Sequence, residues 1–201
     1  MKSILRSHRV SVLTALLCIA SPLPVSGQMH GHEHMNMQEQ LHVHGHGGMI
    51  TSTAILVATS GSSVSGTLKF REIEDRIVHI TGTVTGLTPG KHGFHIHVNG
   101  NCDSPDGMSA GGHFSPAGGK HGAPDAKEHH MGDLGNIVAD AGGRANVDVI
   151  AAGVSLALMG PGSIDGRAIV IHAKEDDFSD PVGNSGARVA CGVIEADMMR
   201  M

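Results

Sequence analysis

Short runs of apolar and β-branched residues, each followed by glycine-rich turns, recur along the chain from about residue 51. Regularly spaced short strands with turn signals between them are typical of an antiparallel sandwich or barrel, in which alternate side chains face the core. No convincing long helical pattern interrupts them. The sequence therefore predicts an all-β domain with eight strands, at residues 54–58, 64–70, 77–85, 92–98, 137–139, 145–150, 167–172 and 189–195.

Two stretches break this rhythm, residues 99–136 and 173–188, and both are too long to be hairpin turns. Long loops on a compact β scaffold usually carry function. Because these two stretches hold most of the polar chemistry of the chain, we expect them to form the functional site. The chain has 201 residues, enough for one such domain with its own core, which we place at residues 51–201.

The first 27 residues have the pattern of an export signal. Three basic residues, Lys2, Arg6 and Arg9, precede the apolar stretch 10–20, and residues 25–27 offer a cleavage point. A membrane anchor is the competing interpretation, but a span needs about 20 apolar residues and this stretch has roughly half that length. We therefore expect a cleaved signal peptide, no stable membrane anchor and an exported protein.

Residues 28–50 form a low-complexity segment with almost nothing able to pack. Such a composition predicts disorder in the absence of metal. A merely solubilising tail is one interpretation. Because imidazole and thioether groups together bind Cu(II) and Cu(I), the other is a metal-binding segment. Its ligands are His30, His32, His34, His42, His44 and His46, mixed with Met29, Met35 and Met37.

The charge balance and the cysteines limit the partners and the compartment. The full chain has a formal net charge of −5, and loss of residues 1–27 removes three positive charges and no negative ones, which leaves −8. A nucleic-acid partner is therefore not expected. Cys102 and Cys191 would remain, and an even pair in an exported protein favours a disulfide over two buried thiols.

Histidines cluster at spacings that suit metal binding. His95 and His97 are two residues apart in a predicted strand, so their side chains leave the same face and can hold one ion. That motif alone is a weak signal. In the glycine-rich loop after it, three histidines and an aspartate follow at spacings of 8, 9 and 3, and this donor set suits a tetrahedral zinc. They are His113, His121, His130 and Asp133.

Six motifs in a fixed order resemble the copper,zinc superoxide dismutases, and the resemblance covers residues 51–196. The motifs are Gly93-Phe94-His95-Ile96-His97, Ala110-Gly111-Gly112-His113-Phe114-Ser115-Pro116, Lys120-His121-Gly122, His130-Met131-Gly132-Asp133-Leu134-Gly135-Asn136, Val170-Ile171-His172 and Ala187-Arg188-Val189-Ala190-Cys191-Gly192-Val193-Ile194. The resemblance implies a Greek-key β-sandwich or flattened eight-stranded barrel with one copper and one zinc ion per subunit. It also implies dismutation of superoxide to oxygen and hydrogen peroxide.

Carried over by motif, the resemblance gives each metal a ligand set and makes His113 the bridge between them. As an imidazolate bonded through both nitrogens, His113 could release one metal and take up a proton there, while copper cycles between Cu(II) and Cu(I). Zinc would hold the bridge in position. The implied copper ligands are His95, His97, His113 and His172, and the implied zinc ligands are His113, His121, His130 and Asp133.

The same resemblance assigns roles to residues around the ligands. Arg188 would be a catalytic residue that attracts and orients the anion, and a Cys102–Cys191 disulfide would hold that arginine still. Asp176 would accept hydrogen bonds from one copper histidine and one zinc histidine; an exposed acidic run is the competing interpretation.

The remaining histidines of the predicted domain are less well placed for metal binding. His79 lies within a predicted strand, His129 is adjacent to His130, and His92 occupies a position with a structural role in the family pattern. We therefore expect all three to be scaffold or surface residues.

The chain also departs from the family pattern. The segment 178–186 is shorter than in the familiar cytosolic members and has Pro181 where they carry a channel lysine, although Lys174 remains. Any steering of an anion toward a chain of negative net charge would depend on the metals and Arg188. The spacing around Cys102 also differs, so no dimer geometry can be carried over from the family, and the sequence leaves the oligomeric state open, with a homodimer as one possible assembly.

Two other classes of function compete with catalysis. A copper carrier or buffer would use the tail alone, and an interaction module of this fold would need no open copper position. Both tolerate the loss of a ligand or of the arginine, whereas here all are present. We therefore interpret the chain as an exported superoxide dismutase of the bacterial periplasm, with secretion as the alternative.

Overall fold

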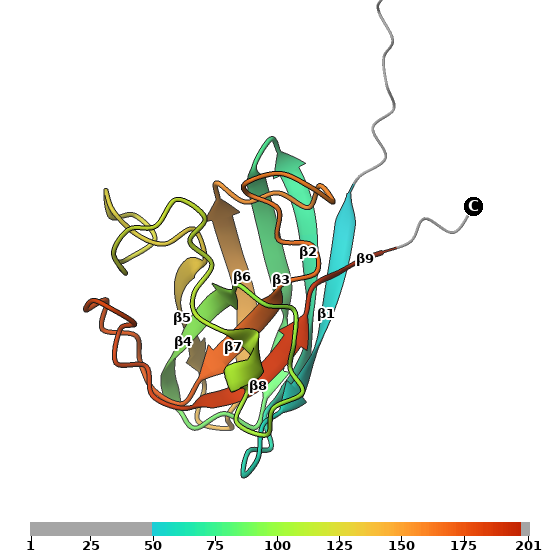
Figure 1. The fold of residues 1–201 in the computed structure, drawn as a ribbon. Coiled ribbons are helices and arrows are strands. Elements are labelled where there is room, and N and C mark those ends of the chain that lie inside the picture. Colours follow the sequence, from blue (N-terminus) through green and yellow to red (C-terminus); the bar gives the residue numbers. More distant parts are fainter. Residues whose placement is uncertain (1–49, 198–201) are drawn as a thin grey trace, which may run out of the picture. The chain divides into compact units, whose positions relative to one another are not determined.

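The computed structural model describes residues 50–197, which form a nearly closed antiparallel β-barrel (Figure 1). The predicted signal peptide and residues 28–49 of the predicted metal-binding segment lie outside the described residues. Within that range the only helical element is a 3₁₀ turn, η1 (Met108–Ala110), and no helix there is long and apolar enough to cross a membrane. The strands are β1 (Thr51–Ala58), β2 (Ser65–Glu74), β3 (Ile77–Thr85), β4 (Gly90–His97), β5 (Asp133–Ala139), β6 (Ala145–Ala152), β7 (Ala168–His172), β8 (Arg188–Val193) and β9 (Glu195–Ala196).

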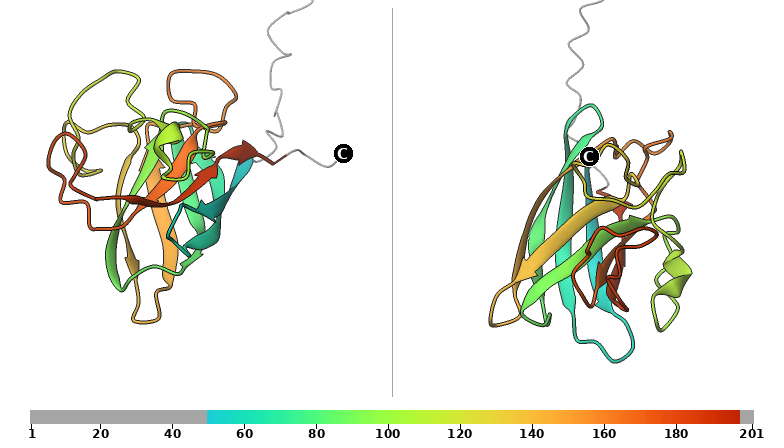
Figure 2. Two further views of the ribbon diagram at one scale, coloured as in Figure 1. Left: turned by 60° about the horizontal axis from the view of Figure 1, so that its bottom comes forward. Right: turned by 90° about the vertical axis from the view of Figure 1, so that its left-hand side faces the viewer.

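The eight longer strands follow the order β5-β4-β7-β8-β1-β2-β3-β6, and all neighbours are antiparallel. β5 and β6, at the two ends of this order, contact each other and nearly close the barrel. β9 pairs with β1 beside the main path. Figure 2 shows the loops after β4 and β7 on one side of the barrel. The predicted all-β fold with two long loops is therefore confirmed.

The two-residue period of β4 separates the core from the site. Phe94 and Ile96 point into the barrel core, so His95 and His97 face the other side of the sheet. β4 pairs with β7 so that His95 lies opposite Val170 and His97 opposite Ala168. His172, two residues beyond Val170, continues that face. All six residues of β4 from His92 to His97 are buried: Phe94 and Ile96 lie in the core, whereas His95 and His97 lie under the long loops, where they contact Asp176 and Gly111.

A small second cluster of apolar side chains fixes the first long loop to this face. It consists of Ala110, Ala168, Val170 and Cys191, with Cys102 packed against it. The predicted disulfide is present: Cys102 and Cys191 are bonded across 89 residues of chain. A cross-link over a loop of this length contributes about 4.6 kcal/mol in the chain-entropy model. The loop before His113 is therefore fastened to β8.

Several strand boundaries differ from the sequence prediction, and two of them do so because of partners distant in sequence. β5 begins at Asp133 rather than at residue 137, because Asp133 pairs with His95 across a bulge in the β4–β5 ladder. The predicted last strand, 189–195, is interrupted at Ile194, whose N–H donates to the carbonyl of Arg167. Neither feature follows from apolar periodicity, since both depend on a partner distant in sequence.

A candidate bimetallic centre

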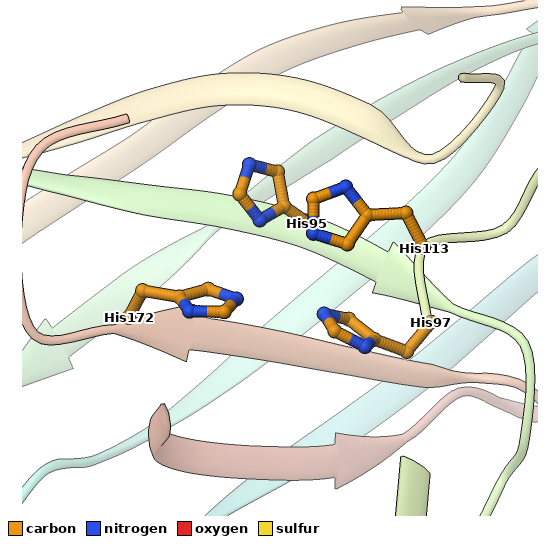
Figure 3. Close-up of side chains that lie close together, drawn as sticks. All are labelled: His95, His97, His113 and His172. Atoms are coloured by element: carbon orange, nitrogen blue, oxygen red, sulfur yellow. The ribbon is translucent and has the colours of Figure 1, made fainter. Parts of the chain in front are cut away.

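The structure brings the predicted ligands together in two overlapping groups. In each group one potential ligand atom per residue lies within 4.8 Å of the others, and His113 is a member of both. Figure 3 shows the rings of the first group converging from β4, β7 and the loop. The copper-set residues, as we call the first group, are His95, His97, His113 and His172; the zinc-set residues are His113, His121, His130 and Asp133.

The shared ligand, His113, is positioned by the backbone of β4. His113 and His97 form an isolated antiparallel bridge, and the next residue, Phe114, donates its N–H to the carbonyl of Ile96 at 2.8 Å. The Phe114 side chain is 2% exposed and belongs to the main core. His113 lies in a loop, but its position is fixed as firmly as that of a strand residue, because the neighbouring Phe114 is anchored in the barrel.

The zinc-set residues are organised around the carboxylate of Asp133. His113 Nδ1 lies 2.7 Å from Oδ1, and the backbone N–H groups of His130 and Gly122 donate to Oδ2 at 2.8 and 3.2 Å. His121 Nδ1 is 3.0 Å from Oδ1, although it lacks the geometry of a hydrogen bond. One carboxylate therefore fixes residues that are up to 20 positions apart in the chain.

Hydrogen bonds to backbone carbonyls fix the tautomers of the copper-set histidines. His97 Nδ1 donates to the Gly111 carbonyl at 2.9 Å, and His172 Nδ1 donates to the Gly186 carbonyl at 3.2 Å. Because a carbonyl only accepts, each of these nitrogens carries the proton and the Nε2 atom keeps its lone pair. In both rings that Nε2 atom is buried and has no partner.

Asp176 fixes one histidine of each set in the same way. Its Oδ2 accepts from His95 Nε2 at 2.7 Å and its Oδ1 accepts from His121 Nε2 at 2.9 Å, with all three side chains fully buried. The lone pairs of His95 and His121 are consequently on Nδ1. This bridge explains why Asp176 also forms a close group with these two rings, and it places Asp176 where the resemblance implied.

The unpartnered nitrogens show which groups the site fits. Five buried ring nitrogens have no hydrogen-bond partner: His95 Nδ1, His97 Nε2, His121 Nδ1, His130 Nδ1 and His172 Nε2. A buried lone pair without a partner is costly unless a ligand uses it. Four imidazoles suit copper, and three imidazoles with one carboxylate suit zinc. The residues present therefore fit one ion of each kind.

Burial sets the protonation of the copper-set side. Desolvation lowers the pKa of His95 to about 4, despite its hydrogen bond to Asp176, and lowers that of His172 to about 3. The pKa of His97 is also well below its usual value because of burial. All three rings are therefore neutral near pH 7 and have a lone pair available for a metal.

Carboxylates set the protonation of the zinc-set side. Burial acts to lower the pKa of His121, but Asp176 and Asp133 outweigh it and raise the pKa. For Asp133, burial acts to raise the pKa, but hydrogen bonds from His113 and the His130 backbone outweigh it and hold the pKa well below its usual value. The carboxylates thus favour a positive charge on this side of the site, which a bound cation would supply.

The structure also shows site residues that sequence reasoning missed. Asn136 brackets Asp176 by donating to its carbonyl at 2.9 Å and accepting from its N–H at 2.8 Å. Gly183, with φ of 69°, packs so closely that a Cβ atom there would overlap Asp176 Oδ1 and lie 2.6 Å from His121 Nε2. Asn136 ends a quoted motif, so it could have been singled out; nothing in the local sequence marks Gly183.

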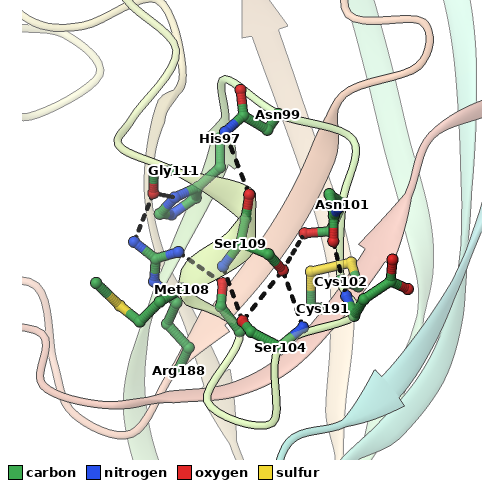
Figure 4. Close-up of a disulfide and its surroundings, with 12 residues drawn as sticks. His97, Asn99, Asn101, Cys102, Ser104, Met108, Ser109, Gly111, Arg188 and Cys191 are labelled. Carbon is green, nitrogen blue, oxygen red and sulfur yellow. Dashed lines mark hydrogen bonds between the residues drawn. A yellow bond between two sulfur atoms is a disulfide. The ribbon is translucent and has the colours of Figure 1, made fainter.

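Arg188 is joined to the copper set through one carbonyl. Its guanidinium donates to the carbonyls of Gly107 at 2.7 Å and Gly111 at 2.5 Å, and the Gly111 carbonyl also accepts from His97. Gly111 has φ of 75°, and a Cβ atom there would lie 2.7 Å from Val98. Figure 4 shows this network beside the disulfide. Arg188, His97, His113 and His172 all line one open cavity of about 750 Å³.

The three other histidines have local partners. The ring nitrogens of His92 lie 2.8 Å from the carbonyl oxygens of His172 and Thr88, so this buried ring supports the strand end that carries His172. His79 pairs with Asp148 at 2.6 Å on the outside of the barrel, and His129 Nδ1 lies 2.7 Å from the carbonyl of His130. Among residues 50–197, none of the three belongs to a group of close ligand atoms.

Comparison with known proteins agrees with this geometry. The family model described as copper/zinc superoxide dismutase matches residues 64–194. Superoxide dismutase 2, copper-zinc type, of Mesembryanthemum crystallinum is 46% identical over 149 residues, which cover 70% of this chain and 93% of that protein. A crystal structure of the clock protein EA4 matches with a TM-score of 0.65 at 39% identity, over 72% of this chain and 93% of that one. With its two ligand sets joined at one histidine, the chain belongs to the copper/zinc superoxide dismutase family.

Proposed function

We propose that the protein dismutates superoxide to molecular oxygen and hydrogen peroxide, with copper held by the copper-set residues and zinc by the zinc-set residues. The observation that carries this function is the set of five buried, unpartnered ring nitrogens that converge on two neighbouring points. A histidine cluster that served only the fold would satisfy these atoms with hydrogen bonds. The family and the named relative support the same activity.

The protein side of this chemistry is proton handling at His113. Copper, when bound, supplies the Cu(II)/Cu(I) couple that takes an electron from one superoxide and gives it to the next. His113 Nδ1 faces Asp133 at 2.7 Å, which leaves Nε2 for the copper-set side. With Nδ1 held in the zinc set, Nε2 can take up and release a proton inside the cavity. A superoxide that has gained an electron needs two protons to leave as hydrogen peroxide; His113 can supply one of them and water the other.

Arg188 is placed to bring the anion to this point. Two of its N–H groups are used by backbone carbonyls, which fix the plane of the guanidinium, and the others remain for an anion in the cavity. Burial lowers the pKa of Arg188, but a guanidinium keeps its charge in proteins. A fixed positive charge beside the copper-set residues can attract superoxide despite the negative net charge of the chain.

The activity is tested on the full mature chain loaded with both metals. Cyanide-sensitive consumption of superoxide is expected, and His113→Ala should lose most of it, because both ligand sets lose a member. His79→Ala, which changes an outer-surface histidine paired with Asp148, is the matched control and should keep full activity. Superoxide consumption by wild type that does not exceed that of free copper would refute the proposal.

Export, location and the tail are proposed from the sequence, because these segments lie outside the described residues. A signal-like leader supports export, and the disulfide suits an oxidising compartment, for which we propose the bacterial periplasm over secretion. The histidines and methionines of residues 28–50 are proposed to gather copper or zinc. A tail-deleted variant should then metallate more slowly under metal starvation. Equal metallation would contradict this role.

A homodimer is proposed from the exposed side of β1. Ile55 and Val57 are 68% and 62% exposed, and they lie beside a groove that Cys102 and Cys191 also line. Apolar side chains at adjacent positions on one sheet face favour contact with a second apolar surface. Sedimentation should show a dimer that Ile55→Ser with Val57→Ser converts to a monomer. A wild-type monomer at every concentration would contradict the proposal.

A further inference from the structure

Met108 lines the same cavity as three of the four copper-set residues. These are His97, His113 and His172, and Arg188 lines the cavity too; because Met108 is exposed whereas His97 and His172 are buried, the thioether lies at the rim and the imidazoles at the floor. Figure 4 shows the Met108 and Arg188 side chains on the same side of η1. One solvent-accessible cavity therefore connects the Met108 thioether with three imidazoles of the copper set.

The Met108 side chain is not used in packing. It is 59% exposed and belongs to neither hydrophobic cluster of the described residues. Its backbone, in contrast, is firmly held: its N–H donates to Asp106 Oδ1 at 2.9 Å, and its carbonyl accepts from Gly111 at 3.0 Å. The disulfide at Cys102 anchors the same loop. An apolar side chain is thus presented to solvent from a rigid turn, at the mouth of the site.

A thioether at this place has the properties of a capture ligand for Cu(I). Thioether sulfur is a soft donor that favours Cu(I), and it needs no deprotonation to bind. It is also neutral, so unlike a carboxylate or thiolate it does not repel an anionic substrate that uses the same opening. Asp106, which lines the same rim, partly offsets the positive charge of Arg188 that a cation must pass.

The floor of the cavity can draw the ion inward. His97 and His172 are 1% and 5% exposed, and their unpartnered Nε2 atoms belong to a four-imidazole set. Several imidazoles bind more tightly than one thioether, so an ion that exchanges ligands one at a time moves downhill from rim to floor. We propose that the Met108 thioether is a transient docking ligand for incoming Cu(I). This inference rests on the proposed copper site at the cavity floor.

The test measures the rate of Cu(I) uptake by the metal-free full mature chain with its disulfide intact. Cu(I) is supplied anaerobically as its bicinchoninate complex, and loss of the colour of that complex follows the transfer. Met108→Leu keeps the volume and removes the sulfur. Met159→Leu is the matched control, because Met159 is 87% exposed and does not line the cavity. His97→Ala, which lacks a floor ligand, defines the uptake by other parts of the chain.

Met108→Leu is expected to slow site-specific Cu(I) uptake about tenfold, the equivalent of about 1.4 kcal/mol in the barrier, with unchanged final copper content. Cu(II) uptake should not change, since a thioether is a poor ligand for Cu(II), and Met159→Leu should match wild type for both ions. Cu(I) uptake by Met108→Leu at the wild-type rate would overturn the docking role and leave the copper site intact. Wild type that takes up no more copper than His97→Ala would overturn both proposals.

Discussion

The two ligand sets share His113 but are built in opposite ways. His95, His97 and His172 stand on β4 and β7, and their free nitrogens are directed mainly by backbone carbonyls of the surrounding loops. The zinc set is drawn from residues 113–133, whose stretch 115–130 is mostly exposed and has little apolar anchorage. The sheet preforms one set, whereas one carboxylate and a cation must order the other. The comparison teaches that a metal can act as part of the core where side chains cannot.

Asp133→Ala should produce the largest difference between the two sets in how much metal affinity they lose. Without this carboxylate the zinc set loses a ligand and the partner of the His130 and Gly122 N–H groups. Zinc affinity, measured against a chromophoric chelator, should fall by more than the roughly 100-fold upper limit for an outer partner. Copper retention should change by less than about tenfold. Equal loss of both metals would show that the strand-borne set is not preformed.

Asp176→Ala should weaken both sets together. Alanine accepts from neither ring, so both His95 and His121 lose the partner that fixes their tautomers. Loss of such a partner costs roughly 10–100-fold in metal affinity. Glu175→Gln, at an exposed position paired with Lys91, is the control and should leave both affinities unchanged. An effect on one metal only would argue against the shared bridge.

In the protein without bound metal, the histidines of the two sets should make the free energy of unfolding depend on pH in opposite directions. The folded pKa values of His95 and His172 are about 4 and about 3, below the unfolded value of 6.5. The contribution of these neutral rings to stability is therefore complete above pH 6.5 and is lost as the pH falls toward the folded pKa. The loss is about 1.4 kcal/mol per pH unit for each ring. His121, with a raised pKa, contributes below pH 6.5 and loses that contribution as the pH rises through its folded pKa.

Urea unfolding of the metal-free protein between pH 4.5 and 7 measures this balance. In wild type the free energy of unfolding should decrease as the pH is lowered. In His172→Gln this decrease should be smaller by about 1.4 kcal/mol per pH unit, the slope that one proton gives. His121→Gln should leave the wild-type slope unchanged below about pH 6.5, where this ring is protonated in both the folded and the unfolded state, and should change the profile only above that pH. The same slope in all three proteins would contradict the assigned protonation states.

Gly183→Ala tests how closely the second long loop must approach the ligands. Alanine with positive φ costs about 1–2 kcal/mol wherever it is placed. Gly118 is the matched control, because its φ of 70° is nearly equal to the 69° of Gly183. A Cβ atom at Gly118 meets nothing within 4 Å, whereas one at Gly183 overlaps Asp176. Both variants should lose similar stability from strain, but only Gly183→Ala should also lower metal affinity. Normal metal binding by Gly183→Ala would show that Asp176 can shift without consequence.

The smallest effect is expected from Arg188→Lys. Lysine keeps the charge but cannot hold the Gly107 and Gly111 carbonyls with one planar group, so attraction persists while orientation suffers. The rate at low ionic strength should fall by less than about tenfold, and salt should still slow the reaction because the charge remains. Arg188→Gln should fall further and lose that salt dependence. Equal rates for Arg188→Lys and Arg188→Gln would show that the charge of residue 188 does not guide the anion.

Much of the site was visible in the sequence because local rules decide it. His95 and His97 share a face through the two-residue period of a strand, and the spacing from His113 to Asp133 marks a loop that can close on an ion. The pair of cysteines in an exported chain indicated the disulfide, and the resemblance supplied His172 and Asp176. Gly183 and the early start of β5 at Asp133 were not predictable, because each depends on a neighbour brought in from another part of the chain.

The sequence by itself determined which side chains are donors, which face of β4 carries them and where the long loops begin. The tertiary structure alone decided which nitrogen of each ring is free. That choice follows from where the Gly111 and Gly186 carbonyls and the Asp176 carboxylate come to rest, 14 to 81 residues from the rings they bind. An imidazole has two nearly equivalent nitrogens, and only a hydrogen-bond partner fixed in space can choose between them.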